Sequence, residues 1–358
     1  MPSSPPVRSQ NRIFYLDLLR AVASFGILFL HLSPLTGQAD AVSALPWQIV
    51  TVVKAFARWC VPVFLMISGA LFLSPDRPFS VKRLYRKSIA RILVSFFVWS
   101  AFYALVHCVL MGKGKWTFLN QLLRGHYHMW FLLAILGLYM LTPLLRRMTA
   151  SNEATRYFLV LGLLFAFLIP QATGALSLFP LPHGDILQSA RSFLSQANPL
   201  SGAYMLVYFV LGYFLHAAPA KKGIKFPAAL LASLSLLLTI LLTLRLSLHL
   251  GAPDFRFCEP NSVFVLGMSV GVFLLAKHAV PASQPSEKAA RIVHHLSDCA
   301  LGVYLMHPFF VERLQVALPT SAVGLIAGLL LEAAVFYLLS VAVSTILRRV
   351  PVLGKWIV

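Results

Sequence analysis

The sequence has few charged residues, and very few of them are acidic. Only 11% of its 358 residues are charged, with 11 Asp and Glu against 30 Lys and Arg, whereas 59% are hydrophobic. The mean hydropathy of +0.79 is far above what a soluble domain with a single core requires. These values exclude a soluble globular domain and predict an integral membrane protein.

Cysteine is also scarce. The four cysteines have no CxxC spacing and lie in or beside apolar stretches, at Cys60, Cys108, Cys258 and Cys299. Neither a disulfide framework nor a zinc site is therefore expected, and no other metal site is predicted.

The formal charge of +19 raises the question of a nucleic-acid partner. Most of the cations lie in short runs between apolar stretches, however, and not in one basic block. Such a distribution indicates membrane topology. We expect the lipid bilayer, and no nucleic acid, as a partner.

Apolar runs of about 17–25 residues, long enough to cross a hydrocarbon core, recur along the whole chain. They predict an all-α fold in one membrane domain over residues 1–358, with about ten transmembrane helices at 13–33, 48–73, 89–111, 129–145, 156–172, 200–216, 226–250, 260–278, 298–318 and 321–347.

Charge asymmetry between the two sides of these spans predicts their orientation. If the loops alternate, most cations fall on the side that holds both termini, and the opposite side has only Lys113, Lys115, Arg124, Arg191 and Arg256. By the positive-inside rule both termini are cytoplasmic. The first span could be a cleaved signal peptide, because "ADA" at 39–41 resembles a cleavage site. Its polar residues favour a retained helix.

The first span, "YLDLLRAVASFGILFLHL" at 15–32, contains Asp17, Arg20 and His31. A charge at a membrane centre costs about 2.5–3.5 kcal/mol on an insertion scale, so each needs a reason. Arg20 and His31 are about three helical turns apart, within roughly 20° of one face and about 16 Å along the axis. Asp17 lies one turn before Arg20. This face is predicted to line a pocket.

Polar residues also occur in or beside other spans. His126, His128 and Trp130 open the fourth span, and His307 precedes Pro308 in the ninth. Proline removes a backbone donor, and a polar residue at such a break often lines a pocket. By contrast, Lys54 and Arg58 share a helix face near a span end and are predicted, in part, to snorkel.

Four stretches, in order, resemble the acyltransferase 3 family. The opening stretch has an arginine and a histidine separated by ten residues, as the family signature does. "VPVFLMISGALFL" (61–73), "HMWFLLAILGLYMLTPLL" (128–145) and "LGVYLMHPFF" (301–310) resemble further family stretches. The family often has Arg-x-x-Arg before the third helix; here Arg83-Leu-Tyr-Arg86 is present, and Ser88 replaces the first arginine of the better-aligned position.

The resemblance implies a membrane-bound O-acyltransferase in a bacterial cytoplasmic (inner) membrane. Its donor substrate would be cytoplasmic acetyl-CoA or another acyl-CoA, with no permanently bound cofactor, and its acceptor a hydroxyl of a surface or lipid-linked polysaccharide. His31 would be the general base, assisted by Arg20 and Asp17. The remaining expected site residues are Arg83, Arg86, Lys87 and Arg91 for CoA phosphates and His128, Trp130 and His307 for the acceptor.

Two alternatives remain open at this point. A secondary transporter could use intramembrane Asp, Arg and His as a proton relay or substrate site, although no paired broken helices are found. A scaffold subunit of a polysaccharide secretion complex would not depend on His31 or Arg20 for glycan acylation.

Overall fold

The structure is a computed structural model. It describes residues 12–32, 42–75, 77–111, 115–176, 188–189, 192–193, 202–279, 285–314, 321–351 and 353–358. Within these ranges all regular secondary structure is helical, which confirms the predicted all-α class. All four cysteines are free.

The helices of the described ranges are, in chain order, α1 (Phe14–Leu32), α3 (Leu45–Ala57), α4 (Cys60–Phe72), α5 (Val81–Arg83), η1 (Leu84–Ile89), α6 (Ala90–Met111), α7 (Lys115–Arg124), η2 (Tyr127–Met129), α8 (Trp130–Thr149), α9 (Asn152–Gly162), η3 (Leu163–Leu168), α10 (Ile169–Leu176), α12 (Tyr204–Ala217), α13 (Lys225–Leu250), α14 (Val263–Ala279), α15 (Glu287–Arg313), α16 (Ala322–Arg349) and α17 (Leu353–Trp356).

Seven helical runs in the described part of the chain are long and apolar enough to cross a membrane: Phe14–Leu32, Leu45–Phe72, Val81–Cys108, Trp116–Thr149, Asn152–Ala175, Lys225–Leu250 and Ala322–Arg349. The shorter apolar helices α12 and α14 and the C-terminal half of α15 lie where the sequence predicts three further spans. The chain is therefore a multi-pass membrane protein. The count of ten and the cytoplasmic position of both termini stay predictions.

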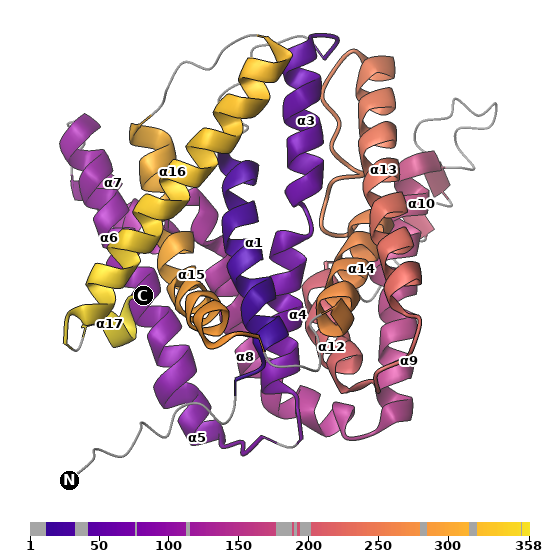
Figure 1. The fold of residues 1–358 in the computed structure, drawn as a ribbon, viewed down its shortest axis with the longest axis horizontal. Coiled ribbons are helices and arrows are strands. Elements are labelled where there is room, and N and C mark those ends of the chain that lie inside the picture. Colours follow the sequence, from indigo (N-terminus) through magenta and orange to yellow (C-terminus); the bar gives the residue numbers. More distant parts are fainter. Residues whose placement is uncertain are drawn as a thin grey trace.

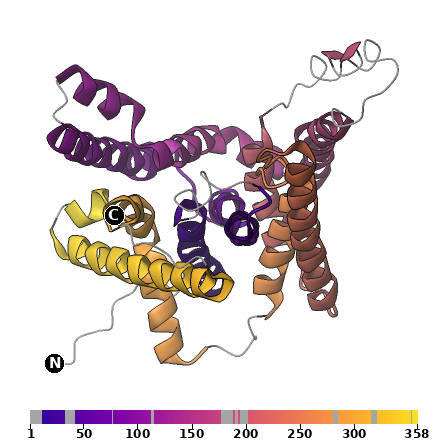
Figure 2. The same ribbon diagram turned by 90° about the horizontal axis from the view of Figure 1, so that it is seen from above.

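Helix α1 lies at the centre of the bundle (Figures 1 and 2) and contacts α3, α4, α14, α15 and α16. Most of its residues are buried, including the polar Asp17 and Ser24. A helix apolar on nearly every side is suited to this position. The polar residues of α1 thus face protein rather than lipid.

The predicted span 48–73 is two helices. The chain breaks at Arg58 and Trp59, between α3 and α4. Pro62, in the first turn of α4, has no N–H and its ring clashes with the carbonyl four residues earlier, which is that of Arg58. The run Leu45–Phe72 as a whole is long and apolar enough to cross a membrane, as predicted, but its helix is interrupted at this point, and the break leaves Arg58 inside the bundle.

Small residues allow α4 and α12 to pack at very short range. A Cβ atom added to Gly69 would lie 1.7 Å from the Phe209 carbonyl oxygen, and one added to Gly212 would lie 2.1 Å from that of Met66. Such contacts between backbones require glycine, as is common where membrane helices cross. This crossing fixes α4 on one side of α1.

Candidate active site

The N-terminal end of α1 holds a hydrogen-bonded polar network. Ser297 Oγ donates to Asp17 Oδ1 at 2.6 Å, and His294 Nδ1 lies 2.9 Å from Asp17 Oδ2. Arg20 follows one turn later; its Nη1 is 3.6 Å from Asp17 Oδ1 and 3.3 Å from Ser297 Oγ. Asp17 is 8% exposed, so α15 and Arg20 together satisfy a buried carboxylate, as burial of a charge requires.

Further along α1 there is a cavity of about 330 Å³, which we call the central cavity. Arg20 and His31, three turns apart on α1, both line it. Among its other lining residues are Arg58, Phe64, His128, Trp130 and Tyr304. Arg20 and His31, which the sequence places on one face of the helix, therefore face the same cavity between helices.

Arg58 lines the central cavity because the helix break places it there. Its partial snorkelling stays a prediction. Lys54 lies over the Phe255 ring at 5.2 Å, a cation–π contact. The sequence flagged Arg58 as an intramembrane charge but gave no role, since the break was not predicted.

Four aromatic rings meet at the C-terminal end of α1. The His31 ring is 4.9 Å from that of His307 and 5.5 Å from that of Tyr127, between centroids. His128 is 5.7 Å from His307. Three predicted site residues from α1, η2 and α15 thus form one cluster. Trp130, which is also predicted to bind the acceptor, is not part of this cluster. It lines the central cavity and is 44% exposed.

Two of these imidazoles have unsatisfied nitrogens. His128 is 1% exposed and His307 0%, and within the described residues Nε2 of neither has a hydrogen-bond partner. His307 Nδ1 lies 3.0 Å from the Val303 carbonyl oxygen, which can only accept, so in the neutral ring Nε2 carries the lone pair. Buried polar atoms are usually paired, so the orphaned Nε2 of His128, which lines the central cavity, indicates a ligand site there.

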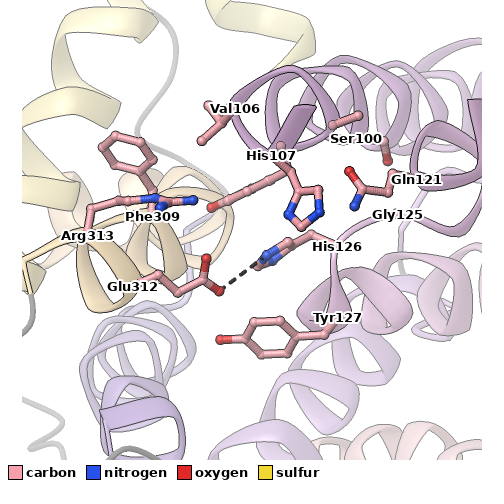
Figure 3. Close-up of a pocket in the computed structure, with 12 residues that line it drawn as sticks. Ser100, Val106, His107, Gln121, Gly125, His126, Tyr127, Phe309, Glu312 and Arg313 are labelled. Carbon is pink, nitrogen blue, oxygen red and sulfur yellow. Dashed lines mark ion pairs between the residues drawn. The ribbon is translucent and has the colours of Figure 1, made fainter. Parts of the chain in front are cut away.

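A second cavity, which we call the side cavity, has a volume of about 270 Å³ and lies between α6, α7 and α15. Polar side chains on its wall include His107, Gln121, His126 and Glu312. Figure 3 shows Glu312 and His126 pointing toward one another; their Oε1 and Nε2 atoms are 3.3 Å apart. His126 stacks on Tyr103 at 4.1 Å between ring centroids.

The four cations expected at CoA do not share one environment. Arg83, at the end of α5, and Arg86 and Lys87, on the π-helix η1, are exposed. Arg91 is half-buried, and its Nη2 donates to the main-chain oxygen of Val358 at 2.7 Å. Beside it Ser95 and Trp99 bind the neighbouring carbonyls. Arg91 thus anchors the last residues to α6.

Sequence reasoning missed His294 and Ser297, which bind Asp17. It gave no role to His126, which contacts His128, or to Glu312, which lies beside His126. The first pairs join residues 277 and 280 positions apart, and one sequence contains no signal of such contacts. No group of three or more His, Cys, Asp or Glu suited to a metal occurs in the described residues.

Fold and site together define a multi-pass membrane protein with a cavity between its helices that is lined by arginine and histidine. Residues 13–349 match the family model described as an acyltransferase domain. The match covers nearly the whole chain, which therefore belongs to the acyltransferase 3 family and is a membrane acyltransferase. No curated protein and no solved structure matches it.

Proposed function

We propose that the protein transfers an acetyl group, or another short acyl group, from cytoplasmic acyl-CoA to a hydroxyl of a surface or lipid-linked polysaccharide. We place it in a bacterial cytoplasmic membrane with both termini in the cytoplasm. The observation that carries the proposal is the central cavity, which Arg20 lines toward one end of α1 and His31 toward the other. A spacing of about 16 Å along the helix suits an extended pantetheine arm.

In this proposal His31 is the general base. It takes the proton of the acceptor hydroxyl as the oxygen attacks the thioester carbonyl. The new carbon–oxygen bond forms, the carbon–sulfur bond breaks, and sulfur leaves with its electron pair as the CoA thiolate, which is protonated from solvent. An imidazole suits this task near neutral pH.

Arg20 binds the donor and stabilises the negative charge that develops on the thioester oxygen. Asp17 supports this role, because its carboxylate lies 3.6 Å from the guanidinium and holds it on the cavity side of α1. The exposed Arg83, Arg86 and Lys87 bind CoA phosphates, for which forked guanidinium donors are well matched. His128, His307 and Trp130 bind the acceptor.

The test uses purified protein and acetyl-CoA labelled in the acetyl group. We expect saturable binding of the donor and slow release of CoA, with both reduced at least tenfold in Arg20→Ala. Arg245→Ala is the matched control, because Arg245 is an exposed cation on α13 that does not line either cavity. A transporter would neither bind nor cleave acetyl-CoA, and that result would contradict the proposal.

A further inference from the structure

Three side chains between the two cavities form a continuous row of contacts. Glu312 Oε1 lies 3.3 Å from His126 Nε2, and His126 Nδ1 lies 2.9 Å from His128 Nδ1. Glu312 and His126 line the side cavity, whereas His128 lines the central cavity. The row therefore connects a carboxylate on one side with a buried imidazole on the other.

The chemistry of the groups determines which nitrogens carry protons. An ionised Glu312 has no proton to give, so a neutral His126 carries its proton on Nε2, the nitrogen that faces the carboxylate, and its Nδ1 then holds a lone pair. His128 must donate from Nδ1 to that lone pair. Its remaining nitrogen, Nε2, is consequently an acceptor, and this is the buried atom without a partner.

Backbone contacts hold His128 in place as well. The Tyr304 hydroxyl donates to the main-chain oxygen of His128, and the Tyr103 hydroxyl donates to that of Leu305 at 2.7 Å. The first bond joins η2 to α15, and the second joins α6 to α15. Helix α15 also supplies Glu312 and His307. His128 is thus held by a hydrogen bond to its main-chain oxygen and by a contact at its ring Nδ1, while its Nε2 has no partner within the described residues.

We propose that Glu312 and His126 are positioning residues that hold His128 as a hydrogen-bond acceptor of the active site, beside the general base His31. The inference rests on the proposed function. A ligand with two O–H donors fits such a site: one gives its proton to His31 and the other donates a hydrogen bond to His128 Nε2. A saccharide meets this requirement, and so does water in the slow cleavage of acetyl-CoA.

The Glu312 carboxylate is the negative charge that faces His126, and replacing it by an amide removes that charge. The other titratable or charged groups around the row are His31 from α1, Arg58 from the α3–α4 break, Tyr103 and His107 from α6, Tyr127 from η2, and Tyr304, His307 and Arg313 from α15.

The experiment compares pH profiles of CoA release from acetyl-CoA by the full-length protein in liposomes. In Glu312→Gln, which keeps the size of the side chain and removes its charge, we expect kcat to fall about tenfold. We expect KM for acetyl-CoA to stay within twofold and the pH profile to change, because the amide removes the charge that faces His126. Glu312→Asp should keep the pH profile of the wild type.

Glu287→Gln is the matched control, since Glu287 is an exposed carboxylate on the same helix, paired only across the surface with Arg291 at 4.0 Å. It should leave kcat and the profile unchanged. An unchanged profile in Glu312→Gln would overturn the role given to the row. Absence of CoA release from the wild type would instead contradict the proposed function itself.

Discussion

At the N-terminal end of α1, both oxygens of the Asp17 carboxylate accept hydrogen bonds from α15. At the C-terminal end, His31 lies against His307, whose Nε2 has no partner within the described residues, as is the case for His128. Both ends are polar, and both lie in the middle of an apolar bundle.

The two ends of α1 differ in whether their buried polar groups have hydrogen-bond partners, and this difference suggests a structural role for one end and a catalytic role for the other. A satisfied buried network stabilises a fold because breaking it leaves polar groups stranded. Unsatisfied buried nitrogens stabilise nothing and persist where a ligand completes them. We therefore expect changes at the N-terminal end to reduce stability first, and changes at the C-terminal end to reduce activity first.

The largest expected effect is that of His31→Ala. Loss of a general base lowers the rate by on the order of 10²–10⁴-fold, so acyl incorporation into the glycan should be abolished. The protein should still insert, accumulate and unfold at the wild-type temperature. Labelled acetyl transfer measures the first property, and membrane yield with a detergent-solubilised unfolding curve measures the second. Full activity of this variant would eliminate the proposed mechanism.

A matched control for this change is His249→Ala, because His249 is an exposed histidine at the end of α13. It should leave transfer and stability unchanged. A similar loss of activity in both variants would show that the effect of His31→Ala is not specific to the cavity.

The converse test is Asp17→Asn at the N-terminal end. The amide cannot carry the charge that Arg20 faces at 3.6 Å, and it satisfies its two donors less well. We expect the free energy of unfolding to fall by about 1–3 kcal/mol, together with a partial loss of activity through a displaced Arg20. Glu153→Gln, on the exposed first turn of α9, is the control. Wild-type stability of Asp17→Asn would remove the distinction between the two ends.

The cations at the start of α6 allow a finer comparison. Replacing the exposed Arg83 and Arg86 together by Ala should raise KM for acetyl-CoA roughly threefold to tenfold with kcat unchanged. Arg91→Ala should mainly lower the unfolding temperature, because Arg91 binds the Val358 oxygen. Arg156→Ala, an exposed cation on α9, should change neither. Steady-state kinetics and thermal unfolding distinguish these results.

Hydropathy alone predicts most of the fold, because every long apolar run corresponds to a helix in the described ranges. The break at Arg58 was missed, since a proline does not lower the hydropathy of a span enough to divide it. The start of α15 at Glu287 was missed too, because its first turns are polar. Ser286 caps that start by accepting from the Ala289 N–H at 3.3 Å.

Only part of the candidate site could be predicted from the sequence. Helical periodicity places Arg20 and His31 on one face, because both lie on one helix with fixed geometry. The contacts of His126 with Glu312 and of Asp17 with Ser297 join separate helices. These contacts depend on how the helices pack against one another, and the periodicity of a single helix carries no information about that packing.

The smallest expected effect tests the same distinction in the loop between α13 and α14. There Asp254 accepts from Arg256 at 2.6–3.1 Å, and Arg256 also donates to the Gly174 carbonyl at 2.6 Å. If paired polar clusters serve stability wherever they lie, Asp254→Asn should lower the free energy of unfolding by about 0.2–1 kcal/mol and leave acyl transfer unchanged.

The pH dependence of the stability difference between wild type and Asp254→Asn identifies the cause of that difference. Hydrogen bonds from Arg256 hold the pKa of Asp254 below its ordinary value. A carboxylate whose pKa is lower in the folded state stabilises the fold above its unfolded pKa, near 3.9, and loses that contribution as the pH falls through the folded pKa. Wild type and Asp254→Asn should therefore differ in unfolding temperature at pH 7 and converge as the pH falls below about 4. Equal separation at both pH values would assign the effect to packing and not to charge.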